Sequence, residues 1–145
     1  MSIFPKNSVL VPIDFSDESI EAINVALEFV TDTSHLWVLH VLAPLNPIEP
    51  GVRWHTVDDQ SRKQQVEKAF HEQFSAQEYQ GINFTVAIRT PAPEILDYAQ
   101  EKKVELIIIP SHGHTGIGRF LLGSVAERIV RYSHCPVLVL RKSAY

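Results

Sequence analysis

The sequence has a single cysteine, Cys135, and no long run of apolar residues. One cysteine cannot form an intrachain disulfide, which excludes the disulfide frameworks of small secreted proteins. The apolar runs have the length of strands, far short of the roughly 20 residues that a membrane span needs. The first residues, MSIFPKNS, lack the basic and apolar segments of a secretory signal. These absences predict a cytoplasmic protein with no membrane partner.

An excess of positive charge is also missing. The chain has 13 Lys and Arg against 17 Asp and Glu, a net charge of -4, which does not favour a nucleic-acid-binding surface. Trp37, Trp54 and Tyr79 do not alternate with a basic patch, so a stacking platform for single strands is lacking. The 145 residues, 45% of them hydrophobic and 21% charged, are typical of a globular protein. We therefore expect one domain over residues 1–145 and no nucleic-acid partner.

Motifs of common catalytic and metal centres are absent as well. There is no G-x-S-x-G and no second cysteine to pair with Cys135, which we expect to be a small buried apolar residue. His112 and His114 lie two apart without a third ligand at a recognisable spacing. His35 and His40 are expected to be core or surface residues. The sequence thus predicts no catalytic residues, no enzyme, and no metal site made by the protein alone.

What the chain does have is a regular alternation of short apolar runs and helix-length segments. Near-continuous apolar runs are typical of parallel strands that are buried on both faces. With right-handed crossovers, this order predicts an α/β fold with a five-stranded, doubly wound parallel sheet and helices on both faces. The expected strands are 8–15, 35–42, 82–88, 105–110 and 135–142, and the expected helices begin after Ser16, run over 58–76, begin at Thr90-Pro91 and run over 123–133.

Each predicted helix has apolar residues at helical spacing, which marks the side that faces the sheet. Ser16 is the expected N-cap of the first helix, with Asp17 and Glu18 in its first turn. The residues expected to face inward are Ile20, Ile23, Leu27 and Val30; Val66, Ala69 and Phe70; Ile95, Leu96 and Ala99; and Val125, Ile129 and Val130.

Two loops, PIDFS after the first strand and PSHGHTGIG after the fourth, are expected to meet at the carboxyl edge of the sheet, where doubly wound folds bind ligands. Asp14 ends the first strand, where its carboxylate could accept from ribose hydroxyls or hold a metal ion on phosphates. The alternative is that Asp14 caps the next helix. A second acidic candidate, Asp17, is already present for that purpose, which favours a functional Asp14.

The glycine loop does not match a familiar phosphate motif. GHTGIG is the reverse of the dinucleotide fingerprint, and the chain has no G-x-x-x-x-G-K-[ST]. What remains is a loop that leads into a helix starting at Gly123-Ser124, whose N-terminal N–H groups attract anions. The alternative is a simple cap made by Ser124 with turn glycines before it. Local spacing favours neither reading.

The segments VLVPIDFS, LHVL, TPAPEIL and PSHGHTGIGRFLLGSVAERIVRYSHCPVLVL together resemble universal stress proteins of the UspA type, over essentially the whole chain. The resemblance implies the strand order 3-2-1-4-5 of an adenine nucleotide alpha hydrolase-like fold. One branch of that family binds ATP through G-x2-G-x9-G-[ST], and another lacks the motif and does not bind ATP. The aligned positions in this chain are Pro110, Gly113, Gly123 and Ser124, so three of the four match.

The resemblance also implies a set of site residues for ATP or a related adenine nucleotide, with Mg2+ on the phosphates. Gly113 would let the loop cross the phosphates, and the helix N-terminus would bind them. Pro12 and Asp14 would contact base and ribose, and the backbone of Val41 would read the adenine edge. The implied nucleotide-binding residues are Pro12, Asp14, Val41, Pro110, Ser111, His112, Gly113, His114, Thr115, Gly123, Ser124 and Val125.

Three residues depart from the family pattern. Pro110 replaces the first motif glycine, which fixes φ and removes one N–H donor. Arg89 replaces a glycine usually found before the xPA element, and it could either compensate as a cation or block the adenine side. His114 stands where Lys or Arg is common, which predicts a pH-dependent phosphate contact. Because a strand end can accommodate a proline, we expect Pro110 to weaken or remodel the site and not to abolish binding.

The last strand, PVLVLRK, predicts an interface. At a sheet edge its backbone groups would be unpaired, and pairing with the same strand of a second copy would satisfy them. The resemblance implies the same antiparallel homodimer, through the region of Val137 and Val139; the alternative is a strand covered by its own helices. The sequence therefore favours a homodimeric, nucleotide-binding stress-response regulatory protein without fast turnover. The alternatives are a dimeric interaction module that binds no nucleotide and, with least support, an enzyme acting on phosphoanhydrides.

Overall fold

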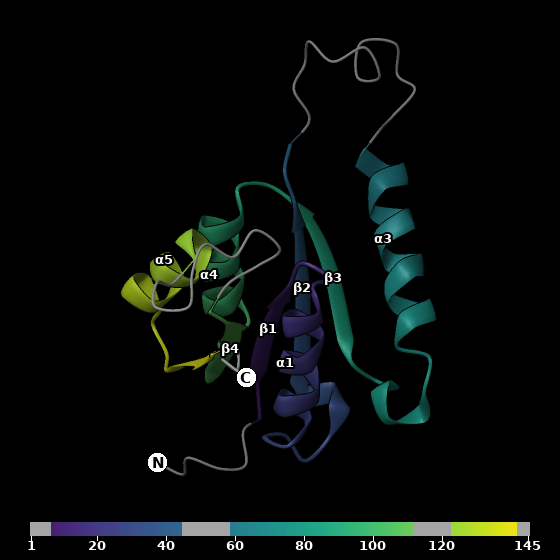
Figure 1. Cartoon of the computed structure of the whole chain (residues 1–145), viewed down its shortest axis with the longest axis horizontal. Helices are drawn as coiled ribbons and strands as arrows, with labels where there is room; N and C mark the ends of the chain where they lie inside the picture. Colours follow the sequence, from purple (N-terminus) through teal and green to yellow (C-terminus); the bar gives the residue numbers. More distant parts are fainter. Residues whose placement is uncertain (1–6, 45–58, 112–122, 142–145) are drawn as a thin grey trace.

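The computed structural model describes residues 7–44, 59–111 and 123–141. In these ranges, five strands form one sheet in the order β3-β2-β1-β4-β5, and every neighbouring pair is parallel (Figure 1). The predicted fold class and strand order are confirmed. The strands are β1 (Val9–Ile13), β2 (Leu36–Leu42), β3 (Asn83–Ile88), β4 (Leu106–Pro110) and β5 (Val137–Leu140).

Helices cover both faces of the sheet, as predicted. Their bounds are α1 (Asp17–Leu27), α3 (Asp59–Gln73), α4 (Pro91–Glu101) and α5 (Ser124–Tyr132), and two short 3-10 helices, which we did not predict, are η1 (Thr33–His35) and η2 (Gln77–Tyr79). Side chains alternate between the two faces along each strand. Val9 and Val11 pack in one core with residues of α1 and α3, and Leu10 packs in the other with residues of α4 and α5. Within the described ranges, no helix is both long and apolar enough to cross a membrane.

Helix α1 begins as predicted. The Oγ of Ser16 accepts a hydrogen bond from the backbone N–H of Ser19 at 3.2 Å, so Ser16 is the N-cap. Ile23 is buried, and three other residues of the expected face are half-buried. Val30 lies beyond the end of the helix, but it still packs against the core.

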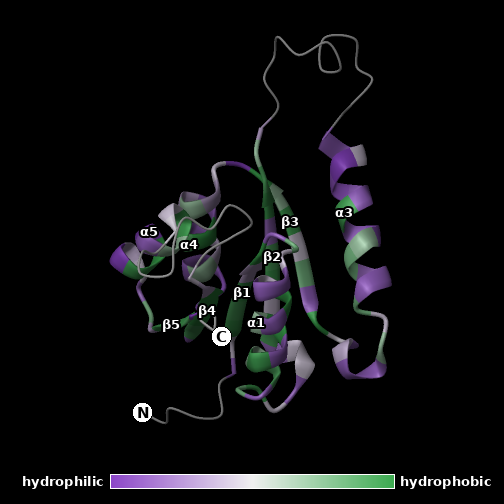
Figure 2. Ribbon diagram, viewed as in Figure 1, coloured by the Kyte–Doolittle hydropathy of each residue, from purple (hydrophilic) through white to green (hydrophobic). Residues whose placement is uncertain are grey.

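The expected inner face of α3 is partly wrong. Phe70 is buried and Val66 is half-buried, but Ala69 is exposed, and Phe74, just after the helix, is also buried. Residues 66, 70 and 74 form a single i, i+4 row, which suffices because α3 packs on the edge strand β3, with Phe70 stacked on Phe84 at 4.0 Å between ring centroids. Figure 2 shows the remaining surface of α3 as mostly hydrophilic.

Three further burial predictions are wrong on the other side of the sheet. Val125 and Val130 of α5 are 38% and 45% exposed, and the buried residues of that helix are Ala126 and Ile129. This short helix therefore turns an i, i+3 pair, and not a wide apolar face, toward the sheet. Cys135 is half-buried instead of buried.

Helix α4 starts at Thr90-Pro91 as expected and buries Ile95 and Ala99, whereas Leu96 is half-buried. Thr90 holds the N-cap position but makes no capping hydrogen bond through its side chain.

The end of α4 is a Schellman motif. The N–H of Val104 donates to the carbonyl of Ala99 at 2.9 Å, and the N–H of Lys103 donates to the carbonyl of Gln100 at 3.2 Å. This geometry places Lys103 in the left-handed region, with φ 54. The position is one where glycine is normally preferred, since glycine has no Cβ.

Candidate functional site

The strand order reverses at β1, which lies between β2 and β4. The β1–β2 pairing runs along the whole of β1, to Ile13 beside His40. The β1–β4 pairing, by contrast, covers only Val9 with Leu106 and Leu10 with Ile107. The loops after β1 and β4 therefore leave from adjacent strands that have stopped pairing with each other, which is the usual place for a ligand in this architecture.

Two prolines explain why this pairing stops. The carbonyl of Ser8 accepts from the N–H of Glu105 on the β4 side, so the backbone of Pro12, an even number of residues further, also faces β4. On β4, the N–H groups of Ile107 and Ser111 bond toward β5, so the intervening Pro110 faces β1. Neither proline has an N–H to donate across this boundary. Pro110 consequently fits as the last residue of β4, beside Leu140, without the loss of a ladder bond to β5.

The turn after β1 places Asp14 between the strand and α1. An oxygen of the Asp14 carboxylate accepts from the N–H of Ser16 at 3.0 Å, and Asp14 is half-buried. The helix is capped by Ser16, and not by Asp14 or Asp17. Phe15, which lies between Asp14 and Ser16, has φ 64, a left-handed value that is unusual for a residue other than glycine.

His40 supports this turn from β2, a contact that sequence reasoning missed. Its Nδ1 lies 2.7 Å from the carbonyl oxygen of Ile13, and its half-buried ring meets the ring of Phe15 edge-on, with 5.0 Å between centroids. The sequence gives one weak indication of this contact, because His40 is a polar residue inside an otherwise apolar strand.

The end of β4 is tied directly to the start of α5. The N–H of Gly123 donates to the carbonyl of Ser111 at 2.8 Å, and Ser111 itself is buried. Gly123 is the N-cap residue, and Ser124 is the first residue of the helix and is exposed. The alternative in which Ser124 is the N-cap is therefore wrong. Gly123 makes no side-chain cap bond to the first turn of α5, and the N–H groups of that turn are hydrogen-bond donors without a partner in the helix.

Of the other predicted site residues, Val41 is half-buried near the end of β2, beside Ala87, and Pro12 is half-buried in β1, beside Leu39. The described members of the predicted set thus lie near the carboxyl ends of β1, β2 and β4 and at the start of α5. The remaining four, His112, Gly113, His114 and Thr115, lie outside the described residues.

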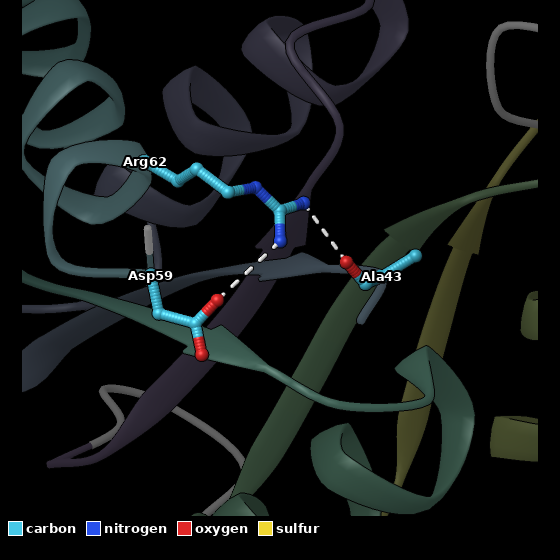
Figure 3. Close-up of polar contacts among 3 residues, drawn as sticks. All are labelled: Ala43, Asp59 and Arg62. Carbon is cyan, nitrogen blue, oxygen red and sulfur yellow. Dashed lines mark hydrogen bonds and ion pairs between the residues drawn. The ribbon is translucent and has the colours of Figure 1, made fainter. Parts of the chain in front are cut away.

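Arg89 and Arg62 lie near the carboxyl edge of the sheet. The Nε of Arg89 is 3.4 Å from a carboxylate oxygen of Glu94 in the first turn of α4, and the Arg89 side chain is 75% exposed. Arg62, which the sequence did not single out, is largely buried. It donates from Nη2 to the carbonyl of Ala43 at 2.8 Å, and its Nη1 is 3.8 Å from Asp59 (Figure 3). Arg62 therefore fixes the start of α3 to the residue that follows β2.

Comparison with known proteins gives the class of this chain. The model of the universal stress protein family matches residues 6–141. The universal stress protein MJ0531 of Methanocaldococcus jannaschii is 34% identical over 140 residues, which cover 92% of this chain and 81% of that protein. The universal stress protein YxiE of Bacillus subtilis is 31% identical over 147 residues, which cover 93% and 99%. The chain belongs to the universal stress protein family.

Solved structures agree with this fold. The structure of the hypothetical protein MJ0577 has a TM-score of 0.73 and 25% identity, with 97% of this chain and 99% of that chain covered. A universal stress protein in complex with cAMP has a TM-score of 0.64 at 22% identity, covering 96% and 99%. An Arabidopsis thaliana family member with AMP bound has a TM-score of 0.62 at 16% identity, covering 95% and 93%. The last two similarities show the fold alone.

Proposed function

We propose that the protein is a cytoplasmic, homodimeric regulatory protein that binds ATP or a related adenine nucleotide at the carboxyl edge of its sheet. The observation that carries the proposal is the bond from the N–H of Gly123 to the carbonyl of Ser111. It holds the N-terminus of α5, which has a glycine at its N-cap, beside the end of β4, next to the strand that leads into Asp14.

The donors present fit the phosphates of a nucleotide. The N–H groups of Ser124 and Val125 belong to the first turn of α5, where the helix dipole also favours negative charge. An Mg2+ ion bound with the nucleotide would neutralise part of the phosphate charge. In the turn after the neighbouring strand β1, the Asp14 carboxylate is an acceptor for ribose hydroxyls. The complexes of other family members with cAMP and AMP support an adenine nucleotide as the ligand.

We expect slow turnover because the described residues of the proposed set offer one candidate general base, Asp14. Asp14 is the sole carboxylate in the proposed set, and one of its oxygens accepts from Ser16. A general base must be able to take a proton from the attacking water. A regulatory role is therefore better supported than an enzyme that acts on phosphoanhydrides.

The proposed dimer uses the outer edge of β5, which is an edge strand with four half-buried residues. The carbonyls of Pro136 and Leu140 face β4, where they accept from Ile107 and Ser111. The backbone groups of Val137 and Val139 therefore point away from β4. Antiparallel pairing with a second copy would satisfy them.

The nucleotide site is tested by calorimetric titration with MgATP, AMP and cAMP at pH 7.5, after removal of any bound nucleotide. We expect saturable binding of one nucleotide per subunit. Ser124→Glu places a carboxylate among the phosphate donors and should abolish binding, while a helix N-terminus tolerates Glu well. Gln64→Glu, at an exposed position in the middle of α3, makes the same charge change and should bind normally.

Each alternative has its own outcome. A folded protein that shows no heat and no thermal shift up to millimolar nucleotide would support the interaction module instead. Accumulation of ADP under turnover would support the enzyme. For the dimer, Val139→Pro removes an outward N–H and spares the β4 ladder. Light scattering should then find a folded monomer, and an unchanged dimer would refute the β5 interface.

A further inference from the structure

The turn between β1 and α1 has a conformation that its own residues do not favour. Phe15 has φ 64, a region that bulky side chains rarely adopt unless their surroundings hold them there. On either side of Phe15, Asp14 accepts from the N–H of Ser16 and Ser16 caps α1. Contacts from outside the turn must therefore stabilise Phe15.

His40 supplies contacts on both sides of Asp14. Its Nδ1 is 2.7 Å from the carbonyl oxygen of Ile13, the residue before Asp14, and its ring touches the ring of Phe15, the residue after it. A carbonyl oxygen can only accept, so Nδ1 carries the proton and donates. This donor is present in both neutral and protonated histidine, and the bond does not depend on the charge of the ring.

The bond is made at the end of the strand, to the carbonyl of the last residue of β1 that pairs with β2. The backbone groups of odd-numbered residues of β1 face β2, so the Ile13 carbonyl is the last that points toward His40, its register partner. Beyond it, β1 leaves the sheet for the turn. The His40 side chain therefore fixes the position where the strand ends and the Asp14 turn begins.

We propose that His40 is a positioning residue of the nucleotide site, which holds the Asp14 carboxylate where it accepts from the ribose hydroxyls of an adenine ribonucleotide. The inference rests on the proposed nucleotide site. It adds to that site His40, whose side chain lies on the opposite side of β2 from that of Val41. It also implies that the preference for a ribose with its hydroxyls depends on His40.

Two substitutions of His40 separate the effect of losing the hydrogen-bond donor from the effect of losing the ring. His40→Asn keeps a donor on the δ atom, in nearly the place of Nδ1, whereas His40→Leu keeps an apolar side chain near Phe15 but has no donor. Calorimetry would compare MgATP with its 2′-deoxy and 3′-deoxy analogues in wild type and both variants. Amide hydrogen exchange of Ser16 in the nucleotide-free protein would report the turn itself.

The wild-type protein should prefer ATP over the deoxy analogues on the order of tenfold, as expected for lost hydrogen bonds to a carboxylate. His40→Leu should weaken ATP binding about three- to tenfold, reduce the preference for the ribose hydroxyls, and accelerate exchange at Ser16. His40→Asn should retain both the preference and the protection. A residue that only stabilises the fold would change the unfolding midpoint and leave the preference intact.

The outcomes distinguish this inference from the proposed function. If the wild type binds ATP and His40→Leu retains the same preference for ATP over the deoxy analogues, the role of His40 is refuted, but the proposed nucleotide site is not. Binding without any preference for ribose hydroxyls also overturns it. Wild-type protein that binds no nucleotide refutes the proposed function, and the role of His40 fails with it.

Discussion

Replacing Lys103 by glycine should stabilise the protein, although it removes a side chain. Lys103 has φ 54 at the end of α4, where Val104 and Ala99 close the Schellman motif. A residue with a Cβ costs about 1–2 kcal/mol in the left-handed region. Glycine avoids that cost but adds about 0.5–1 kcal/mol of unfolded-chain entropy. The net gain expected for Lys103→Gly is about 0.5–1 kcal/mol, or about 1–4 °C in Tm.

Two matched variants isolate the cause. Lys103→Ala removes the same charge and keeps the Cβ, so its stability should stay within about 0.5 kcal/mol of wild type. Lys102→Gly changes the preceding residue, which has φ -84 and whose Nζ lies 5.0 Å from the Trp37 ring centroid. It should lose about 1 kcal/mol or more.

Urea unfolding followed by circular dichroism, at one fixed protein concentration, measures all three variants. The midpoint should move up for Lys103→Gly at constant m-value. If Lys103→Gly were no more stable than Lys103→Ala, the backbone conformation at Lys103 would not be the source of strain, and the reasoning would be wrong.

Two other predictions concern packing and pH. Phe70→Ala should destabilise the fold by about 3–5 kcal/mol, because Phe70 is buried and stacked on an aromatic ring of β3. The control, Ala69→Ser, lies on the exposed side of α3 and should destabilise the fold much less. If the urea midpoints of the two variants were equal, the packing described for α3 would be contradicted. Burial raises the pKa of Tyr98 above its ordinary value of 10.0, although its hydrogen bond with Thr85 opposes the shift. The unfolded chain therefore loses this proton first, and stability should be unaffected below pH 10 and fall as the pH rises above it. Urea midpoints at pH 9, 10 and 11 should fall more in wild type than in Tyr98→Phe, and equal decreases would exclude Tyr98 as the cause.

The sequence predicted the sheet well because its central strands are continuously apolar. Runs such as Val9 to Val11 and Ile107 to Ile109 leave no alternative to burial on both faces. The cap at Ser16 was also predictable, since it is set by residues close to one another in the chain.

The errors came where burial depends on how much of a helix the sheet can cover. Val130 is apolar and at helical spacing, but α5 turns only Ala126 and Ile129 inward. Ala69 is exposed because a helix on an edge strand needs a single row of contacts. Periodicity locates an apolar side of a helix, but the width of the contact is a tertiary property.

The location of the candidate site could be predicted from the sequence, but the contacts that hold its loops in place could not. The position of Asp14 after β1 follows from the strand pattern. The contacts of His40 and Arg62 join segments far apart in the chain, through backbone carbonyls that any residue provides, so no pattern of side chains reveals them. The left-handed conformation of Phe15 gave no signal either, because phenylalanine is not typical of that region.

The central place of β1 has a consequence for how the chain folds. One edge of β1 pairs with β2, which is close in sequence. The other edge pairs with β4, which is far away in sequence, with Val9 beside Leu106. During synthesis, β1, β2 and β3 can assemble while the inner edge of the sheet is still unpaired, on the order of seconds before β4 has been added. In that interval the edge of β1, a strand whose residues Val9 to Val11 are fully buried in the finished molecule, is open to strands of other chains.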